Sequence, residues 1–302
     1  MSTPAPDQLR IYHSIFFEEG WAHQKYYGWT VAEDMPGLRV LRKKRAAFVR
    51  SLLLLSRDGE ASVDAAIARS IGRLGFSDVI VHDFDGIWSQ PPIIDGRRFK
   101  CAGPRERLLN IATFAVDLSL DEADIFARMS SECRRKIKKA EARGVVVEAL
   151  ERPEAKLLQD FVEAFQSLAK ERNLNPIDPD ALARMYLGGD AILFVARKDG
   201  EISNYLHVYK AGRAAIFMYG VNVKKDNDGA GQYLHWHAMR VLKARGVGWY
   251  DLGGVPARDP ADGIYKFKEG FGAPIVDLGT EWRHMGAALQ LAQNVKAAFA
   301  RR

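Results

Sequence analysis

Three short stretches that follow one another closely decide the fold: Ala191-Ile-Leu-Phe-Val-Ala-Arg197, Ile202-Ser-Asn-Tyr-Leu-His-Val-Tyr-Lys210 and Ala214-Ala-Ile-Phe-Met-Tyr-Gly-Val221. Each is rich in β-branched, aromatic and other apolar residues, which favour strands. They are separated by Asp199-Gly200 and Ala211-Gly212, which are turn sequences. The spacing therefore predicts an antiparallel meander of three strands.

The sequence on either side of this meander predicts further elements. Two helices are expected before it, over residues 153–172 and 179–187. After it, the turn Asp228-Gly-Ala-Gly231 opens a helix that runs to Arg245, and Gly248-Trp-Tyr-Asp-Leu252 follows as a strand. Two helices, a meander, a glycine-rich turn, a helix and a strand, in this order, resemble an acetyltransferase-like (GNAT) fold.

The N-terminal part contains the same kinds of element. Strands are predicted at 51–56, 78–82, 112–118 and 145–150, and a helix at 64–74. Another helix is predicted after Ser119-Leu-Asp-Glu122, which has capping-box spacing, with apolar residues at helical intervals as far as Ala140 and Gly144 as its stop.

We therefore predict an α/β protein with mixed sheets, made of two tandem GNAT-like domains. The N-terminal domain, at residues 1–146, would be a degenerate copy, and the segment 281–302 is a candidate to rejoin it. The C-terminal domain is expected at residues 147–280, although no flexible linker marks the junction.

Composition narrows the class of protein. The chain has 302 residues, 47% hydrophobic and 27% charged, as is typical of a soluble globular protein. It has no apolar run of about 18 residues, and its N-terminus lacks the apolar core of a signal peptide. The two cysteines, Cys101 and Cys133, lack CxxC spacing, so neither a disulfide framework nor a structural zinc site is expected. These features favour a cytoplasmic protein.

The charge balance is basic, with 44 Lys and Arg against 38 Asp and Glu. The net charge of +6 favours anionic partners, such as nucleic acid, nucleotide-linked substrates or anionic lipid surfaces. Common catalytic signatures, including G-x-S-x-G, H-E-x-x-H and the Walker A loop, do not occur. His235 and His237 lie two positions apart on a predicted helix, so we expect a core or surface role and no metal.

The glycine turn bears on the cofactor. In acetyltransferases, free backbone N–H groups at such a turn hold the pyrophosphate of CoA. Here Asp226 and Asp228 place negative charge where the pyrophosphate would bind. The sequence thus resembles the fold with an eroded CoA site, and a plain turn at the start of a helix remains the alternative.

The most specific segments are Tyr250-Asp-Leu-Gly-Gly-Val-Pro256 and Gly263-Ile-Tyr-Lys-Phe-Lys-Glu-Gly-Phe-Gly272. They resemble the Tyr-Asp-Phe-Gly-Gly strand and the Gly-x-x-x-Phe-Lys-x-Gly-Phe-Gly stretch of the Fem (FemABX) family. Other pieces agree in order: Gly20-Trp-Ala-His-Gln-Lys-Tyr-Tyr-Gly-Trp29, the helix Cys133–Val145, Ala169-Lys-Glu-Arg-Asn173 and Met218-Tyr-Gly220. The resemblance covers residues 14–283, but the long coiled-coil arm of the staphylococcal-type members is absent between Leu150 and Ala191.

The resemblance implies an enzyme that transfers an amino acid from aminoacyl-tRNA to an amine of a peptidoglycan precursor or of a related peptide or metabolite, without a cofactor. Such a transfer needs a proton acceptor and stabilisation of a tetrahedral oxyanion. Lys268 matches the family lysine that stabilises the oxyanion; alternatively, it is a solvated lysine paired with Glu269. Asp83 is a candidate proton acceptor from the first half, although the substrate itself could remove the proton.

Four residues are assigned to the binding of an anionic, nucleotide-linked or peptide-bearing acceptor. Lys25 lies between two tryptophans and matches a phosphate-contacting lysine, unless it is simply an exposed lysine beside a core aromatic pair. Arg172 matches a second phosphate contact, but could cap its own helix. Tyr219 could orient substrate or be half-buried packing, and Phe267 precedes Lys268 in the motif.

The predicted helix at 128–143 is the most basic surface in the sequence, with seven positive residues against two negative ones. We assign Arg134, Arg135, Lys138 and Lys139 to tRNA binding; a solvated face is the alternative. Arg42-Lys-Lys-Arg45 could add to the same field or touch an anionic membrane surface. Two other functions remain open: an acyl-CoA N-acyltransferase on the same fold, and a non-catalytic protein that binds RNA or a surface.

Overall fold

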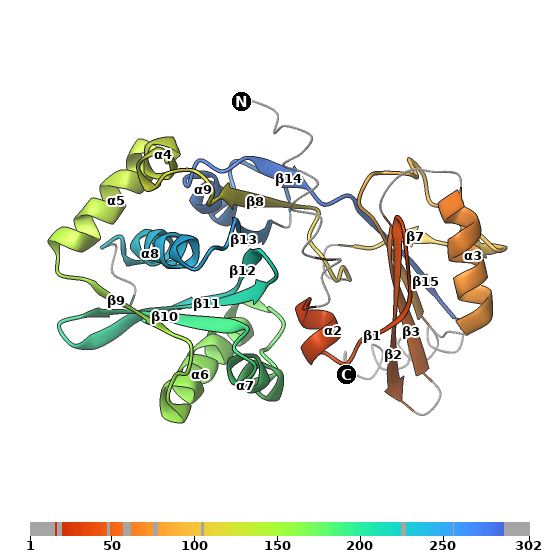
Figure 1. Cartoon of the computed structure of the whole chain (residues 1–302), viewed down its shortest axis with the longest axis horizontal. Helices are drawn as coiled ribbons and strands as arrows, with labels where there is room; N and C mark the ends of the chain where they lie inside the picture. Colours follow the sequence, from red (N-terminus) through yellow and green to blue (C-terminus); the bar gives the residue numbers. More distant parts are fainter. Residues whose placement is uncertain are drawn as a thin grey trace. The chain divides into compact units, whose positions relative to one another are not determined.

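The computed structural model of the protein describes residue 16 and residues 20–46, 49–56, 62–74, 78–103, 106–224, 228–255 and 257–286. The chain divides into two compact units (Figure 1). Unit 1 comprises residues 1–22 and 113–276, and unit 2 comprises residues 23–112 and 277–302.

Unit 1 is built on a seven-stranded sheet in the order β14-β8-β13-β12-β11-β10-β9. Its elements in chain order are β8 (Ala112–Asp117), α4 (Glu122–Arg128), α5 (Ser131–Ala142), β9 (Val146–Leu150), α6 (Ala155–Arg172), α7 (Pro179–Leu187), β10 (Ala191–Lys198), β11 (Glu201–Ala211), β12 (Ala214–Asn222), α8 (Ala230–Ala244), β13 (Trp249–Val255), α9 (Gly263–Glu269) and β14 (Ile275–Asp277). The predicted meander is confirmed: β10, β11 and β12 pair antiparallel, and β12 pairs parallel with β13 after the α8 crossover.

Helices cover both faces of this sheet, with α8 on one side and α6 and α7 on the other (Figure 1). As a result, residues 191–196 of β10 are all buried, although successive side chains of a strand point to opposite faces. On α8, Leu234, Met239 and Leu242 are buried at intervals that place them on a common face.

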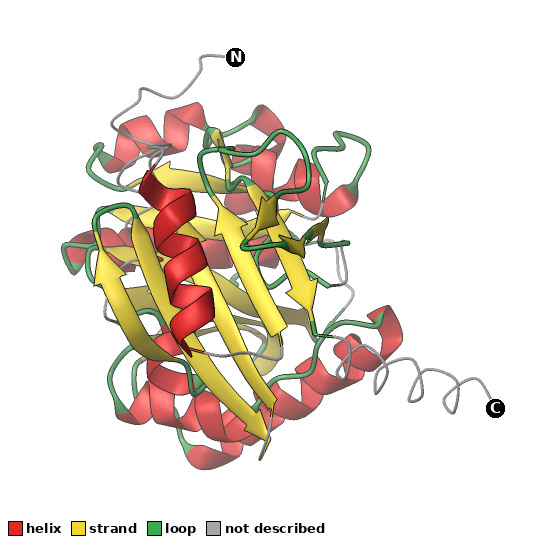
Figure 2. Ribbon diagram, turned by 90° about the vertical axis from the view of Figure 1, so that its right-hand side faces the viewer, coloured by secondary structure: helices red, strands yellow, loops and turns green. Residues whose placement is uncertain are grey.

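Unit 2 contains a six-stranded sheet in the order β1-β2-β3-β4-β15-β7. Its elements are α2 (Ala22–Tyr26, which begins at the unit boundary), β1 (Thr30–Met35), β2 (Leu38–Ala46), β3 (Val49–Ser56), α3 (Ser62–Leu74), β4 (Asp78–Asp83), β5 (Ile93–Ile94), β6 (Arg97–Arg98), β7 (Lys100–Cys101) and β15 (Thr280–Met285). The helix α3 lies across one face of this sheet (Figure 2), where Ile67 and Ile71 join a core with Leu52, Leu54 and Val81.

The two units repeat one pattern. In unit 2, β1, β2 and β3 form an antiparallel meander, and α3 leads to β4, which pairs parallel with β3. Unit 1 does the same with β10, β11, β12, α8 and β13. The fold is therefore the predicted one, an α/β protein with two tandem GNAT-like domains.

The copies differ where the parallel strands meet. In unit 2, β3 and β4 remain paired over six residues, from Ser51 opposite Asp78 to Ser56 opposite Asp83. In unit 1, the pairing of β12 with β13 covers three residues and ends at Ile216. The two strands of unit 1 then continue without a ladder between them, so the sheet opens there.

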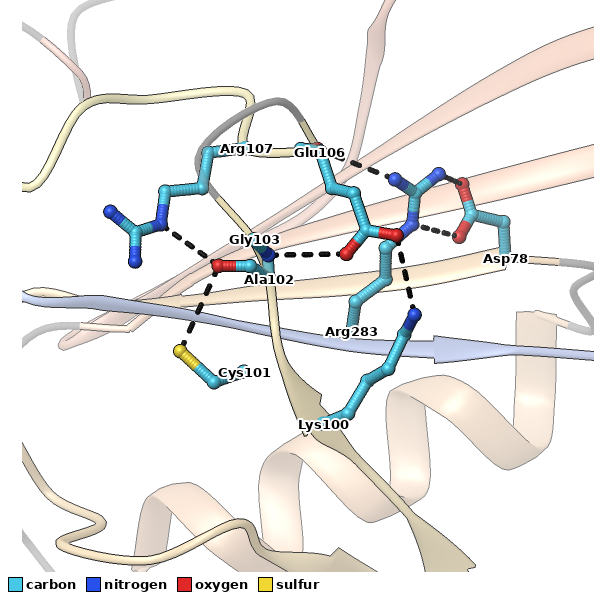
Figure 3. Close-up of polar contacts among 8 residues, drawn as sticks. All are labelled: Asp78, Lys100, Cys101, Ala102, Gly103, Glu106, Arg107 and Arg283. Carbon is cyan, nitrogen blue, oxygen red and sulfur yellow. Dashed lines mark hydrogen bonds and ion pairs between the residues drawn. The ribbon is translucent and has the colours of Figure 1, made fainter. Parts of the chain in front are cut away.

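A buried ion pair fixes the position of β15 beside β4 in unit 2 (Figure 3). Asp78 is buried, and Arg283 binds its carboxylate with Nε and Nη2, each at 2.9 Å. Figure 3 also shows Glu106, which accepts from Lys100 at 3.3 Å and from the Gly103 amide at 3.1 Å. Two parallel charge-assisted bonds define the register of the strands as well as their contact.

The unit boundaries differ from those expected at 146/147 and 280/281. Residues 113–146 lie in unit 1 because β8 occupies a place between β14 and β13 in its sheet. The helix α5 also packs against α8, in the same unit. Strand order and helix packing are long-range features, which the local composition around residue 112 does not reveal.

The long helix predicted to start after the Ser119–Glu122 sequence is two helices, α4 and α5, with Met129 and Ser130 extended between them. Ser130 caps α5 by accepting from the Cys133 amide at 3.1 Å, and its own amide donates to the Gly270 carbonyl at 2.9 Å. The predicted capping box does not form, because the Ser119 hydroxyl donates to Asp117 and Asp121 takes the cap position. Gly144 ends α5 with φ +70°, as predicted.

The break between α4 and α5 is held by a turn that admits no side chain at Gly272. A Cβ there would lie 2.0 Å from the Arg128 carbonyl oxygen, whereas a Cβ at Gly144, with the same φ of +70°, meets nothing within 4 Å. We expect Gly144→Ala to lower the free energy of unfolding by about 1–2 kcal/mol, from backbone conformation alone. Gly272→Ala should cost more than about 3 kcal/mol, because steric overlap adds to the same conformational cost. Equal destabilisation by the two substitutions in urea denaturation would contradict the close packing at Gly272.

Candidate active site

The strand β12 departs from both of its neighbours at one point. Its ladder with β13 ends at Ile216, opposite Asp251. Its ladder with β11 is interrupted directly afterwards by a bulge, which leaves Met218 as the extra residue between Phe217 and Tyr219. β-bulges redirect side chains and are common beside active sites.

The bulge places Phe217 and Tyr219 on opposite faces of the sheet, although they are two positions apart. The Phe217 ring contacts His235 of α8, with ring centroids 5.0 Å apart. The Tyr219 ring contacts Phe165 of α6 at 5.0 Å and stacks on His207 at 5.6 Å. Groups from both faces thus reach the point where the sheet opens.

Lys268 closes the opening between β12 and β13. It lies near the end of α9, a helix that Asp262 caps by accepting from the amides of Ile264 and Tyr265, both at 2.8 Å. The Lys268 ammonium donates to the carbonyl oxygens of Gly253 at 2.8 Å and Gly254 at 2.9 Å. Lys268 is 5% exposed, so the alternative of a solvated lysine paired with Glu269 is wrong.

The two glycines of the Tyr-Asp-Leu-Gly-Gly motif make this contact possible. Consecutive carbonyls of a regular strand point in opposite directions, but Gly253 has φ +76°, and both carbonyls reach one ammonium. A Cβ at Gly253 would lie 2.8 Å from the Phe217 carbonyl oxygen and 3.3 Å from Lys268 Nζ. The position requires glycine for both conformation and space.

Burial sets the acidity of the ammonium. Desolvation, opposed by the negative charges of Asp251 and Asp262, lowers the pKa of Lys268 to about 8. An ammonium has three N–H donors, and the two glycine carbonyls are its hydrogen-bond acceptors among the described residues. The arrangement holds a partly desolvated cation in a fixed position, with its ammonium 5.6 Å from the centroid of the Phe217 ring.

Asp251 supports this cation from the adjacent strand. It is 2% exposed, and its carboxylate accepts from the Thr113 hydroxyl and, at 2.7 Å, from the Gly253 amide. These two bonds orient the carboxylate. Its negative charge acts to raise the pKa of Lys268, against the larger effect of desolvation.

An aromatic box surrounds His235 beside the lysine. The imidazole contacts the rings of four aromatic residues at centroid distances of 5.0–5.9 Å, namely Phe217, Tyr250, Phe267 and Phe271. His235 Nδ1 lies 2.8 Å from the Tyr250 hydroxyl. Burial first, and the Lys268 charge second, lower the pKa of His235 to about 3, so the ring is neutral at physiological pH. Of the two roles predicted for His235, core or surface, the structure shows the core one.

The turn before α8, where a pyrophosphate would bind in an acetyltransferase, is occupied by the chain itself. Asp228 is buried, and its carboxylate accepts from the Ala230 amide at 2.9 Å. Gly229 has φ +89°, and a Cβ there would lie 2.1 Å from the Lys136 carbonyl oxygen of α5. The α5 backbone therefore covers this turn. Asp226, the other acidic residue predicted to oppose CoA, lies outside the described residues.

Two of the predicted site residues lie in unit 2. Lys25 is an exposed residue of α2, with its ammonium 5.6 Å from the Tyr26 ring centroid, and Trp29 is buried. Asp83 is fully buried, and its two carboxylate oxygens accept from the amides of Ile87 at 2.9 Å and Trp88 at 3.1 Å. Those bonds order the loop after β4, and this geometry favours a structural role for Asp83 over proton transfer.

The remaining predicted acceptor residues lie in unit 1. Phe267 is half-buried in the box around His235, next to Lys268. Tyr219 is half-buried at the bulge. Arg172 is exposed at the end of α6, where left-handed Asn173 caps the helix through a backbone bond to Ala169. The side chain of Arg172 is thus not needed as a cap.

The four residues assigned to tRNA binding lie on α5 and differ in their contacts. The Arg134 guanidinium donates to the carbonyl oxygens of Ala127, at 2.9 Å, and Met129, and so caps the end of α4. Arg135 makes a two-bond pair with Glu132, at 2.8 and 2.7 Å. Lys138 is exposed, and Lys139 is partly exposed. The helix still presents a basic face, but Arg134 belongs to the fold.

The sequence-based assignment missed Asp251, Tyr250, Phe217 and Thr113. Asp251 and Tyr250 stand in the motif that carried the resemblance, and this motif could have pointed to them. Phe217 and Thr113 reach the site through strand pairing and the bulge, which no local pattern indicates. Within the described ranges, no three His, Cys, Asp or Glu residues group as metal ligands would, and no helix is long and apolar enough to span a bilayer.

The comparisons with known proteins agree with this architecture. Residues 127–269 match the family described as acetyltransferase (GNAT) domain. No curated protein sequence is detectably similar to the chain.

Among solved structures, FemX matches with a TM-score of 0.67 and 14% identity, covering 98% of this chain and 99% of FemX. L-PGS from Bacillus licheniformis matches with a TM-score of 0.56 and 15% identity, covering 94% and 93% of the two chains. The C-terminal domain of a putative lysylphosphatidylglycerol synthetase from Agrobacterium fabrum matches with a TM-score of 0.54 and 12% identity, covering 97% and 94%. At the level of the fold, the resemblance to the Fem family is confirmed over nearly the whole chain.

Proposed function

We propose that the protein is an aminoacyltransferase, which moves an amino acid from aminoacyl-tRNA to an amine of a peptidoglycan precursor or of a related peptide or metabolite. The fold and the matched GNAT domain support a transferase of this general kind. The observation that carries the finer proposal is the buried Lys268 ammonium, fixed by two carbonyls at the opening of the sheet.

Lys268 suits the stabilisation of an oxyanion. When an amine attacks the ester of an aminoacyl-tRNA, the carbonyl oxygen becomes negative and needs a donor already in place. The third N–H of Lys268 provides such a donor in partly desolvated surroundings, where the interaction is stronger than in water. His235 and Phe267 line the apolar side of the same site.

The donor is proposed to be RNA-linked because the CoA position is obstructed. The Ala230 amide already donates a hydrogen bond to the Asp228 carboxylate, and the α5 backbone covers Gly229. A pyrophosphate would meet a buried carboxylate and a backbone carbonyl in place of free amides. The same helix α5 carries the basic face that suits an RNA backbone. We propose no cofactor beyond the aminoacyl-tRNA co-substrate.

The acceptor is proposed to be anionic. Lys25 in unit 2 and Arg172 in unit 1 are each proposed to contact a phosphate, and Tyr219 in unit 1 is proposed to orient the substrate. Lysylphosphatidylglycerol synthetase is named among the proteins of similar fold, so an anionic lipid headgroup belongs in the acceptor panel beside peptidoglycan precursors. The basic segment 42–45, part of β2, is a candidate for peripheral contact with such a surface. We propose a cytoplasmic location.

The donor can be tested directly with radiolabelled aminoacyl-tRNA and a panel of acceptors, in which amines are compared with the hydroxyl-bearing headgroup of phosphatidylglycerol. Transfer of label should occur and should be abolished by ribonuclease. Titration with acetyl-CoA should show no binding tighter than about 1 mM, because Asp228 repels its pyrophosphate. Micromolar binding of acetyl-CoA, or acetyl transfer that is insensitive to ribonuclease, would favour the acyl-CoA-dependent alternative.

Lys268→Met should lower turnover about 10²–10³-fold, the usual cost of removing one oxyanion donor. Its effect on stability should be small, because relief from burying a charge offsets the removal of two hydrogen bonds. In the wild type, the ammonium deprotonates as pH rises through the Lys268 pKa of about 8. Since arginine stays charged, the ratio of wild-type to Lys268→Arg turnover should fall above that pH. A ratio that rises with pH would instead identify Lys268 as a base.

The basic face can be tested by charge reversal of Arg135, Lys138 and Lys139 to glutamate. Arg134 is left intact, because it caps α4. For each interaction with a phosphate that the reversal removes, the log–log salt slope of tRNA binding should decrease by about 0.7–0.9. A control with the same change in charge reverses Arg152, Lys156 and Lys170, which are exposed near and along α6. Equal slopes for the two triple variants would show that α5 is an ordinary solvated face.

A further inference from the structure

A groove of about 340 Å³ runs between α4, α5 and α8, on the outside of unit 1. Its floor is apolar and partly aromatic: half-buried Phe126 packs on the buried Trp236, with ring centroids 5.2 Å apart, and buried Ile137 lies beside them. The groove is shallow and open to solvent, so it would contact one face of a small planar molecule. None of the residues placed at Lys268 lines it.

The rim combines carboxylates with a cation. Glu122 and Glu141 line the groove, together with Lys138. The charge of Glu122 is balanced by Arg240, whose Nε lies 2.8 Å from it. The charge of Glu141, after burial, helps to raise the pKa of Tyr233 on α8. Because carboxylates accept hydrogen bonds, the groove offers acceptors above an aromatic floor and excludes an anion from its interior.

These features match a nucleobase that carries an amino group. Aromatic side chains stack unpaired bases, and glutamate accepts from the exocyclic amine of such a base. The phosphate of the same nucleotide must stay outside the groove, where Lys138 marks the edge shared with the basic face of α5. The apolar floor thus matches the face of the base, the carboxylates match its amino group, and the cation matches the phosphate of the same nucleotide.

We propose that this groove binds one unpaired, amino-bearing nucleotide of single-stranded RNA, with the base on Phe126, its amine at Glu141 and its phosphate at Lys138. The proposal rests on the proposed function, since it supplies the basic helix with a site for a base. The occupant is a nucleotide of RNA.

Fluorescence anisotropy with labelled oligoadenylate, oligocytidylate and oligouridylate of equal length tests the groove. Wild-type protein should bind the two amino-bearing sequences at least about fivefold more tightly than oligouridylate, as one carboxylate–amine contact provides. Glu141→Gln should bring the three affinities together. Removing a negative charge strengthens binding to every sequence alike, so the affinity ratio isolates the contact. Glu171→Gln on α6 makes the same charge change at another exposed position and should preserve the ratio.

Phe126 is half-buried, so Phe126→Leu should fold, which a thermal melt verifies. It should weaken all three oligonucleotides about fivefold or more, the cost of removing one stacked base. Equal affinity of wild type for the three sequences, or a ratio unchanged by Glu141→Gln, overturns the groove proposal. If either of these results is found while transfer of the amino acid remains sensitive to ribonuclease, the groove proposal fails and the proposed function is retained. Absence of both RNA binding and ribonuclease-sensitive transfer overturns the two together.

Discussion

The opening between β12 and β13, and the lysine that occupies it, are the constraint on which the site depends. Three residues of parallel pairing hold the strands together, and beyond Asp251 the carbonyls of Gly253 and Gly254 bind an ammonium. A side chain at Gly253 would collide with β12, and without the positive φ there the two carbonyls would point apart. The motif glycines, the bulge in β12 and the burial of Lys268 are therefore one structural unit.

The second copy of the fold shows what happens without this opening. In unit 2, β3 and β4 stay paired to Ser56 and Asp83, and the Asp83 carboxylate is taken up by amides of the following loop. A closed ladder leaves no place for a ligand group between the strands. Because of this difference, the proposed chemistry is placed in unit 1.

The helix α5 has several roles at once. Its backbone covers the turn at Gly229, its exposed side carries the basic residues, and its edge forms one wall of the groove with Phe126 and Trp236. The break before it, at Met129 and Ser130, sets its direction. A continuous helix through this point would not follow the same path over α8, so a small backbone feature determines both the covered turn and the proposed RNA surface.

Most elements of unit 1 and the tandem GNAT-like fold could be predicted from the sequence, because hydrophobic periodicity, turn residues and helix stops such as Gly144 act locally. The motif around Lys268 likewise predicted a role for this residue, which the structure shows buried against Gly253 and Gly254. Other features emerge only when the chain is folded: residues 113–146 belong to unit 1, and α4 and α5 are separate helices. The capping of α4 by Arg134 is another such feature, as is the placement of Phe217 and Tyr219 on opposite faces of the sheet. These outcomes follow from strand order, a bulge and close backbone packing, which join residues far apart in the chain and leave no signal in the local sequence.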